Sequence, residues 1–157
     1  MPEARIYTIR GQNPAAVTHK KVQLSSYDPQ AQYQILEFKV LPAGRATNTD
    51  CYGSITMGKN DNIDPSDPQF KNQNEIAWAH HAIRQPVPPG LGESVQISHW
   101  DLVDEKLFAY DVWVHTKDLL SAESVNWYIK IKKYYVKPVA ASIASLRQFQ
   151  YNDQESQ

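Results

Sequence analysis

Histidines are the first residues of this chain that could bind a metal ion or transfer a proton. His80 and His81 are adjacent, and His99 and His115 lie elsewhere in the sequence. Neighbouring side chains on a strand point to opposite faces, so His80 and His81 do not easily share a metal ion. The spacing of these histidines in the sequence does not match that of metal ligands. We therefore expect solvated or hydrogen-bonded histidines, with no metal site and no other cofactor.

Three aspartates in one polar loop are the second candidate cluster. Asp61, Asp64 and Asp67 offer carboxylate oxygens of the kind that calcium prefers. Their spacing does not match the twelve-residue calcium loop, and no glutamate closes it. Asx-turns beside proline explain the same residues, and we expect those turns.

The single cysteine, Cys51, is the only candidate thiol nucleophile. It begins an apolar segment, and a buried cysteine is usually inert. The chain contains neither a Gly-x-Ser-x-Gly motif nor a phosphate-binding glycine loop. We therefore expect no catalytic residues. A small enzyme with His80 or His81 as its base is the hypothesis with the least support.

A basic cluster near the end of the chain could bind a nucleic-acid backbone. Lys130, Lys132 and Lys133 are followed directly by Tyr134 and Tyr135. Lysines bind phosphates, and neighbouring aromatic rings stack on bases. The alternative is a solvated strand whose lysines prevent pairing with other chains.

Four tryptophans are many for a chain of 157 residues. Trp113 and Trp127 fall on predicted strands and are expected in the core. Trp100, in the run SHWD, is expected to follow a strand into a turn. It could stack on a sugar, anchor an interface or belong to the core.

Alternating apolar and polar residues predict the strands that position these side chains. The clearest run is 124–136, and the next are 107–115 and 33–41. Shorter strands are expected at 6–9, 21–25, 51–57, 75–83 and 94–98. The inward side chains are expected to be Val125, Trp127, Ile129 and Ile131, then Phe108, Tyr110, Val112 and Val114, and finally Leu36, Phe38 and Val40.

The remaining segments indicate loops and one short helix. Proline-rich and polar stretches predict loops at 58–74 and 85–92. After Pro138, apolar residues recur at Val139, Ile143 and Leu146, which predicts a short amphipathic helix. We expect one antiparallel β-domain over residues 1–150, followed by a polar tail at 151–157.

Charge and hydropathy exclude few partners. Lys plus Arg number 16 and Asp plus Glu 17, so no global field draws the chain to nucleic acid. A net charge near zero favours association between copies. No apolar run approaches the roughly 20 residues of a membrane span, so we expect no membrane partner. The first ten residues, MPEARIYTIR, lack the apolar core of a signal peptide, which makes intracellular synthesis the expectation.

The last third of the chain resembles capsid proteins of small circular Rep-encoding single-stranded DNA viruses. The runs SHWDLVDEKLFAYDVWVHTKDL and VNWYIKIKKYYVKPVAASIASLRQF carry the resemblance. Asp111 to Val114 is similar to the Asp-Val-x-Val strand of these proteins, and Asn126 to Ile129 is similar to their final strand. The resemblance implies an eight-stranded jelly roll, with a short C-terminal helix, that assembles with identical subunits into a shell.

The resemblance also implies a location and a genome. The protein would lie in the virion, and in the host cell during assembly, with single-stranded DNA as a possible cargo. Such capsid proteins usually begin with an arginine-rich arm, whereas this chain begins with only Arg5 and Arg10. Genome contact would then depend on Lys130, Lys132 and Lys133.

Two functions of different classes follow from the sequence. The first is a viral coat protein, with no enzymatic activity, whose subunit contacts come from loops. A carbohydrate-binding β-sandwich, with Trp100 or a loop tyrosine as its platform, is the alternative. The residues expected at subunit contacts are Asp61, Asp64, Phe70, Pro88, Leu91 and Trp100.

Overall fold

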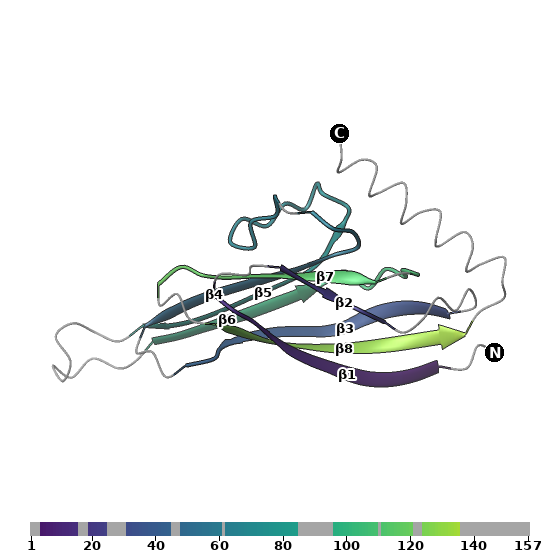
Figure 1. Ribbon diagram of the computed structural model, residues 1–157, viewed down its shortest axis with the longest axis horizontal. Coiled ribbons are helices and arrows are strands. Elements are labelled where there is room, and N and C mark those ends of the chain that lie inside the picture. Colours follow the sequence, from purple (N-terminus) through teal and green to yellow (C-terminus); the bar gives the residue numbers. More distant parts are fainter. Residues whose placement is uncertain are drawn as a thin grey trace, which may run out of the picture.

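The described part of the chain folds as an antiparallel β-sandwich of eight strands (Figure 1). The computed structural model describes residues 4–15, 19–24, 31–44, 48–60, 62–84, 96–109, 111–120 and 124–135. The strands are β1 (Ala4–Asn13), β2 (His19–Val22), β3 (Ala31–Pro42), β4 (Thr49–Thr56), β5 (Glu75–Arg84), β6 (Gln96–Val103), β7 (Val112–Asp118) and β8 (Val125–Tyr135). The helix expected after Pro138, the whole 85–92 loop and the polar tail lie outside the described residues.

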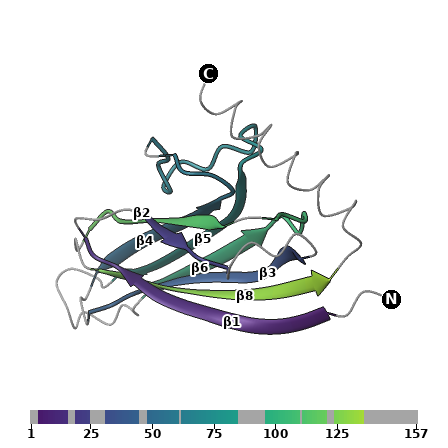
Figure 2. The same ribbon diagram turned by 45° about the vertical axis from the view of Figure 1, so that its right-hand side comes forward.

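Two sheets pack face to face (Figure 2). The smaller sheet has the strand order β1-β8-β3, and the larger has the order β2-β7-β4-β5-β6. Every pairing in both sheets is antiparallel. The expected all-β, antiparallel architecture is therefore confirmed.

Alternation along β8 supplies one wall of the core. Val125, Trp127, Ile129 and Ile131 are buried, whereas the residues between them are half-buried. The predicted faces of this strand are confirmed. Across the sandwich, Ile55 of β4 and the valines of β7 complete the buried cluster. Burial of these side chains is the main force that holds the two sheets together.

A β-bulge changes the expected faces of β3. The register against β8 shifts between Ile35 and Glu37. Ile35 is therefore fully buried, and Leu36, which was predicted to point inward, is only half-buried. Phe38 and Val40 lie beyond the bulge and are buried as predicted. Strict alternation failed here because a bulge inserts one residue into the period of two.

The two sheets approach each other closely at Gly53 of β4. A Cβ atom at this position would lie 2.5 Å from Cγ1 of Val40 and 2.8 Å from Cζ of Phe38. Any side chain here would push into two buried residues of β3, so glycine allows the close packing of β4 on β3.

The expected strand at 107–115 is shorter and later than predicted. β7 begins at Val112, and Phe108 makes only an isolated bridge to Tyr33 of β3. Directly before β7, Oδ1 of Asp111 accepts a hydrogen bond from the Leu24 amide at 2.9 Å. Phe108 is nevertheless fully buried, so its predicted inward position is confirmed, while Tyr110 is outside the described residues.

Two tryptophan expectations are wrong. β6 continues to Val103, so Trp100 lies within a strand and not in a turn after one. Trp113 is half-buried on the outer face of the larger sheet, opposite Thr56, and does not belong to the core. Trp127 is buried, as expected.

Candidate interaction surfaces

The outer face of the smaller sheet carries most of its basic side chains. On β8, Lys130 and Lys132 alternate with the core residues and therefore point outward. The register places Tyr128 between Arg10 of β1 and Lys39 of β3. We call this surface, formed by Arg10, Lys39, Tyr128, Lys130 and Lys132, the basic face.

An open depression of about 970 Å³ lies on the basic face. Its lining combines two cationic side chains, one carboxylate and the ring of Tyr128. A cationic side chain can bind a phosphate, and a neighbouring aromatic ring can stack on a base. The lining residues are Arg10, Gly11, Gln12, Glu37, Lys39, Leu41, Asn126, Trp127 and Tyr128.

Lys133 does not belong to the basic face. It follows the inward phase of β8, and its Nζ lies 5.9 Å from the Tyr33 ring and 5.1 Å from the Tyr135 ring. Lys132 instead lies over Tyr134, at 4.9 Å. The three lysines expected on one surface are thus divided, because successive side chains of a strand alternate between faces.

The segment between β4 and β5 covers part of the outer face of the larger sheet (Figure 1). The Phe70 ring meets Trp78 edge-on, with centroids 4.8 Å apart. Asp64 lies 3.6 Å from Nζ of Lys117 on β7. Two residues expected at subunit contacts therefore hold this segment on its own sheet, although the Phe70 side chain remains 68% exposed.

Asp64 also forms the Asx-turn that the sequence predicts. Its Oδ1 accepts hydrogen bonds from the Ser66 amide at 3.0 Å and the Ser66 hydroxyl at 2.6 Å. The Ser66 hydroxyl bond, chiefly, lowers the pKa of Asp64. Within the described residues, no three His, Cys, Asp or Glu side chains gather as they would around a metal ion.

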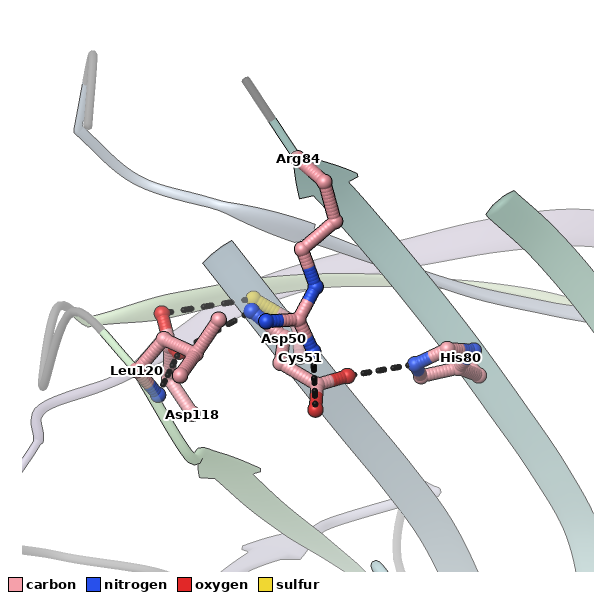
Figure 3. Close-up of polar contacts among 6 residues, drawn as sticks. All are labelled: Asp50, Cys51, His80, Arg84, Asp118 and Leu120. Carbon is pink, nitrogen blue, oxygen red and sulfur yellow. Dashed lines mark hydrogen bonds and ion pairs between the residues drawn. The ribbon is translucent and has the colours of Figure 1, made fainter. Parts of the chain in front are cut away.

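A buried carboxylate–histidine pair lies on the outer face of the larger sheet (Figure 3). His80 Nε2 is 2.6 Å from Asp50 Oδ1, and Arg84 donates to Asp50 Oδ2 at 3.5 Å. The Tyr52 ring stacks on His80 with centroids 4.3 Å apart, and the Trp100 ring lies 5.9 Å away on β6. Sequence reasoning missed Asp50. Only the register between β4 and β5, which places Tyr52 opposite His80, brings the Asp50 carboxylate to the His80 ring.

This pair resembles the acid–base half of a nucleophilic site, but the neighbouring thiol cannot complete it. Cys51 is fully buried and points to the opposite face, and its Sγ lies 3.6 Å from Asp118 Oδ2. Burial, first, and the Asp118 carboxylate, second, raise the pKa of Cys51 to about 12. The thiol is therefore neutral near pH 7, and Cys51 is buried as the sequence predicted.

His81 and His99 lie together on the other face of the β5–β6 pair, with rings 5.6 Å apart. Burial, then the charges of His99 and His80, lowers the pKa of His81. Below the unfolded value of 6.5 the unfolded chain binds more protons at this position than the folded chain does. The stability contributed by His81 is therefore present above pH 6.5 and is lost as the pH falls.

We predict a lower melting temperature at pH 5 than at pH 7.5, with His81 as one cause. His81→Gln should reduce this acid-induced drop, because glutamine does not titrate. Thermal melts followed by circular dichroism at the two pH values measure it, with His19→Gln as the control. Equal acid-induced drops in the two variants would exclude His81 as a cause.

Of the other sequence-predicted contact residues, one lies on the larger sheet and three lie outside the described residues. Trp100 is 39% exposed on the edge strand β6. Asp61, Pro88 and Leu91 lie outside the described residues.

No described helix is long and apolar enough to cross a membrane. Comparisons of the chain with protein-family profiles, with curated proteins and with solved structures found no match.

Proposed function

We propose that this chain is a viral coat protein that assembles with identical copies into a closed shell. The observation that carries the proposal is the order of the strands. An eight-stranded jelly roll pairs the first strand with the last, the second with the seventh, the third with the sixth and the fourth with the fifth. This architecture is shared by viral capsid proteins and lectins.

Three of these four pairings are present in the chain. They are β1 with β8, β2 with β7, and β4 with β5. β8 also joins β3, and β7 joins β4, as the two sheets of a jelly roll require.

The fourth pairing is replaced by a single bridge. β6 pairs with β5 instead of β3, and the chain reaches β3 just after β6. There Tyr33 and Phe108 exchange backbone hydrogen bonds of 2.8 and 3.0 Å. This contact supports a jelly roll in which the sixth strand is displaced into the other sheet.

Assembly into a shell is the outcome that separates a coat protein from a lectin. Each contact of a shell is weak, and symmetry repeats it until no free edge remains. We expect the purified chain to elute in size-exclusion chromatography with light scattering as a very large species, or to form one when the salt concentration is varied. A lectin on the same fold would not exceed a small oligomer.

The basic face is the candidate surface for the packaged nucleic acid. Replacing Lys130 and Lys132 with glutamate should reduce the nucleic acid that copurifies, because phosphate contacts are electrostatic and depend on net positive charge. The ratio of absorbance at 260 and 280 nm measures this. Lys20→Glu with Lys71→Glu is the matched control, since it makes the same charge change elsewhere. Equal nucleic-acid content in the two double variants would contradict this role.

The lectin alternative has one specific observation in its favour. Tyr52, His80 and the partly exposed Trp100 place three rings side by side on the larger sheet. Aromatic platforms of this kind stack on sugar rings. A sugar-induced change in tryptophan fluorescence that Trp100→Ala abolishes, in a chain that stays a small oligomer, would favour the lectin.

A further inference from the structure

β6 is an edge strand whose outward backbone groups have no partner within the described residues. It pairs with β5 on one side and with no described strand on the other. An unprotected edge of this kind is a template for pairing with another chain.

Other edges of the two sheets carry residues that discourage such pairing. β1 includes Arg5 and Arg10, and β2 includes Lys20 and Lys21. β3 ends at Pro42, and its free edge meets Phe108. β6, with the sequence QISHWDLV, contains no lysine, arginine or proline. Long charged side chains and proline are the usual protection of an edge, so β6 stands apart in lacking them.

β6 also exposes apolar side chains on both of its faces. Ile97 is 67% exposed, Trp100 39% and Leu102 49%. Trp100 and Leu102 project from one face, and Ile97 projects from the other, because side chains alternate along a strand. Such a concentration of apolar surface on one edge strand marks an interaction site.

The sequence of β6 is complementary to itself in the antiparallel direction. In a two-fold pairing centred on Trp100, the two Trp100 side chains are opposite each other. On the other face, His99 of one copy is opposite Asp101 of its partner, and Ile97 is opposite Val103. Opposite side chains in an antiparallel pair lie about 4.5–5.5 Å apart at Cβ, where aromatic, apolar and opposite-charge pairs stabilise the sheet.

We propose that two copies of this chain pair through β6 to form a dimer with one continuous ten-stranded sheet. The interface is isologous, because the same strand of each copy contributes both sides. Backbone hydrogen bonds supply affinity, and the His99–Asp101 and Trp100–Trp100 contacts fix the register. The dimer depends on β6 alone, so it can form whether or not the shell does.

Cysteine cross-linking tests both the dimer and its register. In Trp100→Cys the two thiols would face each other across the two-fold axis, close enough for a disulfide. Ser98→Cys is the matched control, because residue 98 projects from the same face but faces position 102 of the partner. The two copies of residue 98 would be about 13 Å apart along the strands, beyond the reach of a disulfide. Cys51 is buried and should not contribute.

We expect Trp100→Cys to give at least about tenfold more reducible dimer than Ser98→Cys on oxidation, because only its thiols meet the distance limit. The double variant Ser98→Cys with Leu102→Cys should regain the cross-link. Equal cross-linking of the two single variants, or none in either Trp100→Cys or the double variant, would overturn the proposal. Circular dichroism of each variant before oxidation confirms that it is folded.

Charge exchange provides a second test in solution. His99→Asp alone should weaken the dimer in sedimentation velocity, because two carboxylates would face each other across the interface. Adding Asp101→His should restore the dimer. Failure of that rescue, with the double variant folded, would contradict the register. Particles without a Trp100 cross-link would refute the dimer alone, and a cross-linked dimer without particles would refute the shell alone.

Discussion

Phe38→Ala is expected to lower the free energy of unfolding by about 3–5 kcal/mol. Phe38 is fully buried, and its ring lies against Gly53 of the opposite sheet. Removing the ring would leave a cavity between β3 and β4 that neither rigid strand can fill. Urea denaturation followed by tryptophan fluorescence measures the loss.

Phe70→Ala is the matched control for this substitution. Phe70 is 68% exposed and touches Trp78 only edge-on. An aromatic pair of this kind contributes about 0.5–1.5 kcal/mol, so the control should lose far less stability. Comparable losses in the two variants would mean that Phe38 does not lie between the sheets.

Asp50→Ala is the second substitution with a large expected effect, at about 3 kcal/mol of unfolding free energy. Asp50 is 8% exposed and accepts hydrogen bonds from His80 and Arg84. Truncation would leave the buried His80 Nε2 without its acceptor. The cost arises because a buried polar group without a hydrogen-bond partner keeps its full desolvation penalty.

Asp64→Ala removes a carboxylate of the same type, but from an exposed ion pair, and serves as the comparison. Asp64 and Lys117 are 49% and 42% exposed in their side chains, and exposed pairs of this kind contribute about 0–1 kcal/mol. Chemical denaturation of both variants at pH 7 gives the two values. If Asp50→Ala costs no more than Asp64→Ala, the Asp50–His80 pair is not a structural contact.

Alternation of apolar residues predicted β3 and β8 close to their observed bounds, and the reason is visible in β8. Val125, Trp127, Ile129 and Ile131 contact the core on one face only, so burial follows the period of two directly. The alanine-rich β5 was also predicted as a strand, although its alanines suit a helix. The strand prediction is correct, and the segment pairs with strands on both sides, β4 and β6.

The errors arise where a tertiary contact overrides local alternation. The bulge beside Leu36 shifts the phase of β3, and Phe108 is buried by a bridge to β3 without belonging to a regular strand. Trp113 follows the alternation of β7, but its face is the outer one, opposite Thr56. Alternation itself placed Val112 and Val114 inward, and both are buried, so the expected core position of Trp113 contradicted the period of two.

The candidate surfaces were harder to predict than the strands. Lys130 and Lys132 lie on one face, but Lys133, next in sequence to Lys132, lies on the other. Asp50 and His80 are thirty positions apart and meet only through the β4–β5 register. Register between strands depends on packing across the whole sheet, and the sequence of either strand alone does not specify it.

Negative-stain electron microscopy of the purified chain tests the coat-protein proposal most directly. We predict closed particles of uniform diameter, present on purification or after a change in salt concentration. Only small, dispersed oligomers under every condition tested, from protein whose circular dichroism shows intact β-structure, would contradict the proposal.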